Sequence, residues 1–185
     1  MTVPSFKDHF SAHASAYARY RPRYPEALFA YLASLCPAHD LAWDCATGNG
    51  QAARSLTEHF ARVVATDASA DQLAHAAPHE QITYHVAPAA QSPLASHSAD
   101  LVTVAQALHW LDLDAFYAEV RRVLKPGGVL AVWTYGLLRI NPAVDAVIQR
   151  LYTDIVGAYW PPERRHVEDG YRALAFPFDA IEPPR

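Results

Sequence analysis

The stretch LAWDCATGNGQ, residues 41–51, decides the fold. It predicts a short buried strand that runs into a glycine turn, with a helix opening at Gln51. Asp44 stands late in the strand, and Gly48 and Gly50 make the turn. Glycines let the backbone approach a ligand closely, and the first N–H groups of a helix have no partner within the helix. The stretch therefore suggests a site for a nucleotide-like cofactor, although many α/β proteins have such a turn and bind nothing.

The composition of this 185-residue chain fits one globular domain, with 51% hydrophobic and 18% charged residues. The formal net charge of −4 gives nucleic-acid binding no electrostatic support. No apolar run approaches the roughly 18 residues of a membrane span. Cys36 and Cys45 form no CxxC pair and the N-terminus lacks the apolar core of a secretory signal, so we expect a cytoplasmic protein with reduced thiols. The ten histidines are scattered without metal-binding spacing, so we expect no metal site.

Strands and helices alternate along the chain. The expected strands cover residues 41–46, 62–67, 82–86, 99–105 and 129–134. The expected helices cover residues 25–36 and 51–60, a segment that a Ser69–Gln72 capping box opens, and a segment that Asp112 or Asp114 caps and the turn at 125–128 ends. Connections of this length imply right-handed crossovers and a parallel sheet, with ligands beyond the carboxyl ends of its strands.

After Tyr135 this alternation stops. Residues 142–158 have the pattern of one amphipathic helix, and the segment that follows suggests a lid or a connection. We therefore expect a core with an N-terminal helical cap over residues 1–135, whose motifs fall in 41–134. A helical lid or connecting segment is expected over 136–185.

Five motifs follow one another in order: DCATGNG (44–50), VVATD (63–67), PAAQSP (88–93), AQALHWLD (105–112) and RRVLKPGGVLAVW (121–133). Together they resemble class I S-adenosylmethionine-dependent methyltransferases of the type 11 group, most of all the trans-aconitate- and ubiquinone-methyltransferase-like small-molecule enzymes. The resemblance covers residues 6–135. It implies a Rossmann-like, doubly wound fold of three α/β/α layers with a mostly parallel sheet. In the family an antiparallel hairpin completes the sheet, but nothing after Thr134 has that pattern, so we expect the hairpin to be absent.

The resemblance also implies how S-adenosylmethionine would be held. Asp44 would receive the ammonium of its methionine part, and the turn at Ala46, Gly48 and Gly50 would lie against that part. Ala46 replaces the first glycine of the family pattern. Asp67 would accept hydrogen bonds from both ribose hydroxyls. For Asp44 the alternative is a carboxylate that only caps the turn.

The resemblance implies further cofactor contacts at positions that match the family pattern less fully. Adenine would lie against Ala68 and Gln72, although Gln72 can serve its helix cap alone. Backbone groups near Ala89 would read the adenine, because the acid common in the family is missing there. In the N-terminal segment, Tyr17 or Tyr20 would cover the cofactor and Arg19 would pair with its carboxylate, the alternative for Arg19 being an ordinary solvated arginine.

The stretch after the expected fourth strand would face the reacting group. Gln106 and Ala107 would lie beside the sulfonium, and His109 and Trp110 would begin the wall between cofactor and acceptor. His109 is the candidate general base if the acceptor is a hydroxyl or an activated carbon. The alternatives are a structural histidine at 109 and core packing for Trp110.

The sequence thus predicts methyl transfer from S-adenosylmethionine to a small molecule with an oxygen, carbon or nitrogen nucleophile, a carboxylate among them. We expect a monomer or homodimer that binds neither nucleic acid nor membranes. Two alternatives stay open. One is a shortened domain that binds S-adenosylmethionine without catalysis, because the hairpin is missing. The other is an NAD-dependent oxidoreductase, against which Ala52 and Ala53 break the GxGxxG spacing.

Overall fold

The computed structural model describes residues 24–182, which divide into two compact units. Unit 1 holds the described residues up to Ala105 together with Leu111–Val132. Unit 2 holds Gln106–Trp110 and the described residues from Trp133 onward. The predicted cofactor contacts at Tyr17 or Tyr20 and at Arg19 lie outside the described residues.

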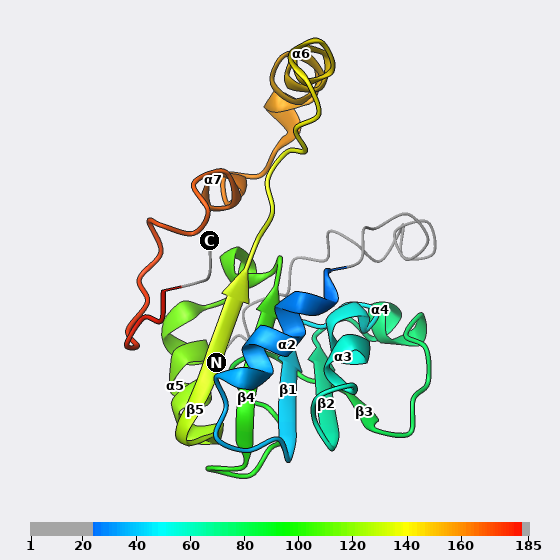
Figure 1. Ribbon diagram of the computed structural model, residues 1–185. Coiled ribbons are helices and arrows are strands. Elements are labelled where there is room, and N and C mark those ends of the chain that lie inside the picture. Colours follow the sequence, from blue (N-terminus) through cyan, green and yellow to red (C-terminus); the bar gives the residue numbers. More distant parts are fainter. Residues whose placement is uncertain (1–23, 183–185) are drawn as a thin grey trace. The chain divides into compact units, whose positions relative to one another are not determined.

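Five strands form one parallel sheet in the order β3-β2-β1-β4-β5 (Figure 1). They are β1 Leu41–Cys45, β2 Arg62–Asp67, β3 Ile82–Val86, β4 Ala99–Ala105 and β5 Leu124–Trp133. The chain leaves β1 toward β3 and returns on the other side of β1 as β4, so the strand order reverses between β1 and β4. This confirms the doubly wound prediction and places the topological switch point at the carboxyl ends of those two strands. Residues 24–182 contain no antiparallel hairpin beside β5.

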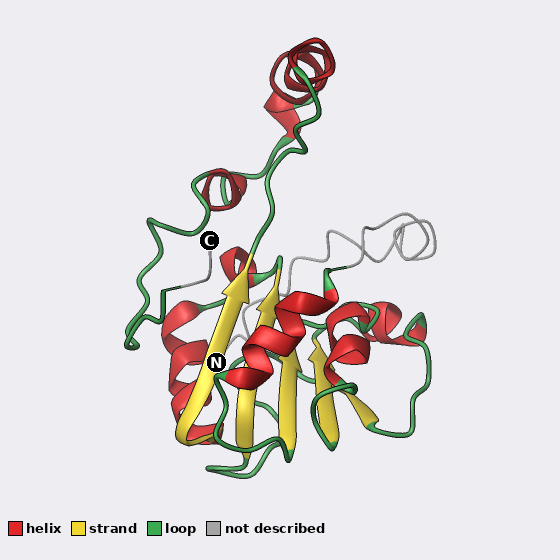
Figure 2. Cartoon of the chain, in the orientation of Figure 1, coloured by secondary structure: helices red, strands yellow, loops and turns green. Residues whose placement is uncertain are grey.

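Helices flank the sheet of unit 1. They are α2 Glu26–Ser34, α3 Gln51–Leu56, α4 Ala70–Ala74 and α5 Leu113–Val123. In Figure 1, α2 crosses the front of the sheet and α5 lies behind β5, and Figure 2 shows strands between helices. All five residues of β1 are buried, as expected for a strand covered on both faces. Trp43 of β1 anchors the core: its ring lies 6.2 Å from that of Phe116 of α5, and its indole N–H donates to Thr66 Oγ1 at 2.9 Å.

Several element boundaries in unit 1 differ from the prediction, and α2 ends at Ser34 instead of residue 36. β1 ends at Cys45, because Ala46 has a φ of +54° and leaves the extended region. α3 ends at Leu56, four residues before the predicted end, and gives way to turns. β5 begins at Leu124, directly after α5, so the predicted start at 129 was wrong. A Cβ on Gly128 would lie 3.2 Å from the carbonyl oxygen of Ala99, which explains a glycine where this strand approaches β4.

Unit 2 consists of short helical segments. They are η2 Leu108–Trp110, α6 Pro142–Arg150, the π-helical η3 Leu151–Ile155, η4 Gly157–Tyr159 and α7 Arg164–Glu168. Asn141 caps α6 by accepting from the N–H of Val144 at 3.1 Å. The single helix predicted over 142–158 is therefore broken into three segments, and α7 was not predicted. None of the helices within residues 24–182 is long and apolar enough to cross a membrane.

Candidate cofactor site

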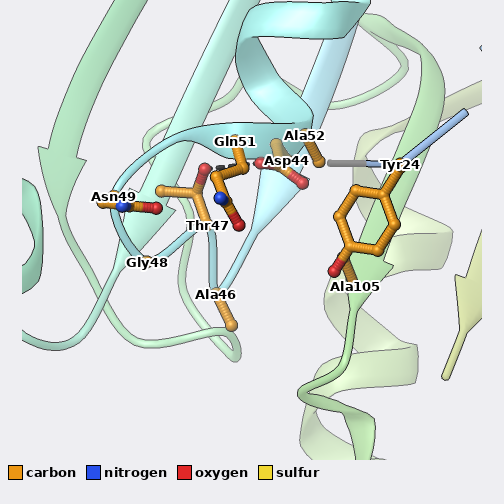
Figure 3. A pocket seen from close by; sticks show the side chains of 9 residues that line it. All are labelled: Tyr24, Asp44, Ala46, Thr47, Gly48, Asn49, Gln51, Ala52 and Ala105. Carbon is orange, nitrogen blue, oxygen red and sulfur yellow. Dashed lines mark hydrogen bonds between the residues drawn. The ribbon is translucent and has the colours of Figure 1, made fainter. Parts of the chain in front are cut away.

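A small hollow lies at the carboxyl end of β1, between the glycine turn and the ring of Tyr24 (Figure 3). Its lining residues are Tyr24, Asp44, Ala46, Thr47, Gly48, Asn49, Gln51, Ala52 and Ala105. The hollow measures about 30 Å³, far below the roughly 300–1,000 Å³ of small-molecule sites. Unit 1 by itself therefore offers a floor and a wall for a ligand rather than an enclosing pocket.

Three residues of the turn have left-handed backbone conformations. Ala46, Gly48 and Gly50 have φ values of +54°, +59° and +84°. A Cβ on Gly50 would lie 2.5 Å from the hydroxyl oxygen of Tyr84, so this position requires glycine for both conformation and space. Ala46 adopts a conformation that costs an alanine roughly 1–2 kcal/mol. The turn is therefore left-handed at Ala46, the position where the family pattern has its first glycine.

Asp44 is a buried carboxylate held by two threonine hydroxyls. Its side chain is 1% exposed, Thr103 Oγ1 donates to Oδ1 at 2.7 Å, and Thr47 Oγ1 donates to Oδ2. Burial raises the pKa of Asp44 to about 6, the threonine hydrogen bonds oppose this rise, and the nearby Asp67 adds to it. A cation placed against Asp44 would stabilise its charged form. The site is therefore prepared for a positively charged group.

Asp67, at the carboxyl end of β2, ties the glycine turn to the start of α4. Its Oδ2 accepts the N–H of Gly48 at 2.8 Å, and its Oδ1 accepts the N–H of Ser69 at 2.8 Å. Each carboxylate oxygen can accept more than one hydrogen bond. Ala68, which follows, is exposed, and Ala89 is half-buried in the loop after β3.

The predicted capping box at α4 is half confirmed. Ser69 Oγ accepts the N–H of Gln72 at 3.2 Å, but the N–H of Ser69 donates to Asp67 and not to the Gln72 side chain. The aspartate competes successfully because a charged acceptor makes the stronger hydrogen bond. The buried Nε2 of Gln72 has no partner within residues 24–182, and its Oε1 lies 3.7 Å from where a Cβ on Gly48 would be. The Gln72 amide is therefore directed toward the glycine turn.

Gln106 and Ala107, predicted beside the sulfonium, belong to unit 2. His109 and Trp110, predicted to begin the wall between cofactor and acceptor, belong to unit 2 as well. Gln106 has a φ of +59°, and its N–H donates to the carbonyl of Trp133 at 2.9 Å. Its Oε1 accepts from Thr134 Oγ1 at 3.0 Å. These bonds shape the backbone immediately after Ala105, which lines the hollow of unit 1.

His109 is paired with Tyr171, 62 residues further along the chain. Its Nδ1 lies 2.9 Å from the Tyr171 hydroxyl, and its ring lies 4.5 Å from that of Trp110. The pKa of His109 is lowered to about 4, first by burial and then by the positive charges of Arg164 and His166. The imidazole is therefore neutral at pH 7, but it is a weak proton acceptor, which disfavours a role in removing a proton from a hydroxyl.

Several site residues were not predicted from the sequence. Thr47 follows Asp44 by three residues, the spacing of a local side-chain turn, and this signal was available. Thr103 reaches Asp44 only because β1 and β4 pair in the register that places them side by side. Tyr84 and Tyr171 likewise reach Gly50 and His109 through tertiary packing, which no local pattern encodes.

Comparison with known proteins decides the family. Residues 43–132 match the family model described as a methyltransferase domain. A solved structure from Anaeromyxobacter dehalogenans, described as a type II methyltransferase, is 52% identical with a TM-score of 0.83, over 89% of this chain and 70% of that chain. This chain belongs to the class I methyltransferase family. The narrower trans-aconitate-like subtype stays a prediction.

Two further proteins similar to this chain are also named as methyltransferases. A Dictyostelium discoideum protein named as a methyltransferase is 36% identical over 174 residues, which are 92% of this chain and 66% of that protein. A phosphoethanolamine N-methyltransferase of Haemonchus contortus, solved with phosphomonomethylethanolamine and S-adenosylhomocysteine, shares the fold at 22% identity, with a TM-score of 0.59 over 81% of this chain and 40% of that chain. The chain spans 66% and 50% of the lengths of the first two curated relatives.

Proposed function

We propose that the chain binds S-adenosylmethionine at the β1–α3 turn and transfers its methyl group to a small-molecule acceptor. The observation that carries this proposal is the buried Asp44 carboxylate, whose pKa burial raises to about 6 and which has no cationic partner among residues 24–182. It lies beside a turn of left-handed residues that Asp67 fixes from the next strand. Family membership supports the same cofactor.

The described residues fit the three parts of this cofactor. Asp44 would pair with the methionine ammonium, and Asp67 would accept the ribose hydroxyls. The amide of Gln72, whose Nε2 has no partner within residues 24–182, would face the adenine or the ribose. The glycine turn leaves room for close approach of the backbone because, among the described residues, a Cβ on Gly48 would meet only the Gln72 side chain, at 3.7 Å.

The protein would contribute orientation and exclusion of water. The bound cofactor supplies an electrophilic methyl group on its sulfonium, so no nucleophile of the enzyme is needed. Holding the acceptor in line with that methyl group can contribute roughly 7–11 kcal/mol. His109, neutral and weakly basic, would orient an acceptor by hydrogen bonding. The weak base favours acceptors that are nucleophilic without losing a proton, such as carboxylates.

Calorimetric titration with S-adenosylmethionine tests cofactor binding. We expect saturable binding by the parent chain, and a loss of about tenfold or more in affinity for Asp44→Asn and Asp67→Asn, because each removes a charge-assisted contact. The matched control is Asp71→Asn in α4, which changes the same charge at an exposed position and should bind like the parent. A folded parent chain that gives no binding heat at millimolar cofactor contradicts the proposal.

A shortened domain that binds the cofactor without catalysis is the second candidate. It is favoured by the five-stranded sheet of the described residues, which has no hairpin beside β5. Incubation of the chain with labelled S-adenosylmethionine and a library of acidic metabolites separates the two. Transfer of label to any acceptor excludes the non-catalytic reading, whereas cofactor binding without transfer across the library supports it.

A further inference from the structure

A second and larger hollow lies within unit 2, formed by η3, η4 and α7. Its volume is about 410 Å³, which falls within the usual range of small-molecule sites. Its lining residues are Tyr152, Thr153, Gly157, Trp160, Pro161, Pro162, Arg164, Arg165 and Glu168. Aromatic rings and prolines thus form apolar walls around two arginines and one glutamate.

Arg164 is the fixed centre of this hollow. Its guanidinium carbon lies 5.4 Å from the ring centroid of Tyr152 and 5.1 Å from that of Trp160. Its Nε donates to the Tyr152 hydroxyl at 2.7 Å, and that hydroxyl donates to Glu168 at 2.6 Å. The Trp160 indole N–H is held in turn by the carbonyl of Tyr152 at 3.1 Å. The guanidinium plane is therefore oriented before any ligand arrives, which lowers the entropy cost of binding.

The terminal amino groups of Arg164 are open to a ligand among the described residues. Within residues 24–182, its terminal amino groups make no hydrogen bond, and no carboxylate lies within ion-pair distance of Arg164. The carboxylate of Glu168 is engaged by Tyr152, and Arg165 adds a second positive charge at the rim. A guanidinium with its fork open binds a carboxylate through two parallel hydrogen bonds.

We propose that this hollow binds an aromatic carboxylate, with the carboxylate on the terminal amino groups of Arg164 and the flat apolar part against Trp160 and the neighbouring prolines. As a binding site it stands on the geometry of unit 2 alone.

The same unit connects the hollow to His109. α7, which carries Arg164, packs against η2, which carries His109. The charged or titratable groups that act on His109 are Arg164, His166 and Glu163, and the Tyr171 hydroxyl contacts its ring nitrogen. An anion on Arg164 would offset one of the two positive charges that lower the pKa of His109. Binding of an anion in the hollow should therefore raise the pKa of His109.

Calorimetry with 2-naphthoate, on the whole chain with and without S-adenosylhomocysteine, tests the site. We expect saturable binding of 2-naphthoate, and binding weaker by about tenfold or more for both the uncharged 2-naphthamide and acetate. Arg164→Gln should lose at least about tenfold in affinity, and Arg164→Lys should fall between Arg164→Gln and the parent because it keeps the charge but not the fork. The matched control Arg172→Gln, exposed and outside the hollow, should bind like the parent.

A second measurement follows the His109 imidazole by NMR. Saturating 2-naphthoate should raise the pKa of His109 in the parent and in Arg172→Gln, but not in Arg164→Gln. The proposal is overturned if the acid and the amide bind alike, if Arg164→Gln binds like Arg172→Gln, or if acetate binds as tightly as 2-naphthoate. Naphthoate binding by a chain that does not bind S-adenosylmethionine would overturn the proposed function and leave this site standing. Cofactor binding without naphthoate binding would overturn the site proposed here in unit 2 and leave the proposed function standing.

Discussion

The charge of the Asp44 carboxylate lowers the stability of the folded chain, and the same charge would favour the binding of a cation. Its pKa in the folded chain is about 6, above its ordinary value of 3.8, because burial disfavours the charge. The folded chain therefore binds this proton more tightly than the unfolded chain does. The contribution of Asp44 to stability must fall as the pH rises through the interval between these two values. A bound cation would offset the unfolding free energy that is lost when the ionised carboxylate is buried.

Asp44→Asn should remove this pH dependence. Between pH 5 and pH 7.5 the parent chain should lose on the order of 1 kcal/mol of unfolding free energy through Asp44, and Asp44→Asn should not lose it. Denaturant unfolding at both pH values, without ligand, measures the difference. Asp71→Asn should follow the parent. The proposed cause is wrong if Asp44→Asn runs parallel to the parent across this interval.

Gly50 should tolerate no side chain. Gly50→Ala combines a φ of +84° with a Cβ 2.5 Å from the Tyr84 hydroxyl oxygen, and should destabilise by roughly 2–4 kcal/mol. Two controls separate the causes in the same denaturation assay. Gly170 has a φ of +65° and open space where a Cβ would lie, so Gly170→Ala should lower the unfolding free energy by only about 1–2 kcal/mol. Gly136→Ala has neither constraint and should be nearly neutral; equal losses for all three would contradict this account.

At the scale of elements, the sequence predicted what local patterns encode. The strands at 62–67, 82–86 and 99–105 have the predicted boundaries, because short apolar runs between turn signals have few alternatives. The caps at Ser69 and Asp112 follow the same logic. α7 was missed because its segment RRHVE buries only Val167, so it carries no apolar period. The pairing of His109 with Tyr171, which this helix brings about, was therefore also out of reach.

Glu119 links α5 to the loop before β4. Its Oε1 accepts the N–H and the hydroxyl of Ser92 at 2.7 and 2.6 Å, and Arg122 donates to the same oxygen at 2.6 Å. Arg122, first, and Ser92 lower the pKa of Glu119 to about 2. A lowered pKa contributes stability above the ordinary value of 4.5, which is lost as the pH falls toward 2.

Acid unfolding should expose this linkage. Between pH 7 and pH 3 the parent should lose about 1–2 kcal/mol through Glu119, after allowance for solvent screening at the partly exposed Arg122. Glu119→Gln should be less stable at pH 7 and should lose less on acidification. The exposed Glu58→Gln is the control and should track the parent. Identical acid profiles for all three chains would show that Glu119 makes no such contribution.

Across the whole molecule, the two units differ in how much they bury. Leu108 and Val167 are the buried apolar side chains of unit 2 within the described residues, whereas unit 1 holds Trp43, Phe29, Phe116 and the rest of the core. α6 buries no residue, and Val147 is 69% exposed. Local stability follows buried apolar contacts, so the units should open at different free energies.

Hydrogen exchange should show this division. Amides of α6 and η3 should exchange at least about a hundredfold faster than those of β1 and β4, with α5 as an internal helical control that should stay protected. Protection of α6 equal to that of β1 would contradict the assignment of low stability. It would mean that the exposed stripe of α6 is covered in solution, which sedimentation of the same sample would detect as self-association.

The central claim is that the β1–α3 turn of this chain holds S-adenosylmethionine. The most direct test is an amide NMR map of the chain titrated with S-adenosylhomocysteine. We expect saturating shifts for the amides of Gly48 and Ser69, which donate to Asp67, and of Gly50 and Gln72 nearby in sequence, and loss of those shifts in Asp67→Asn. Binding that moves other amides and leaves this turn unchanged, or no saturable shift in a folded sample, would contradict it.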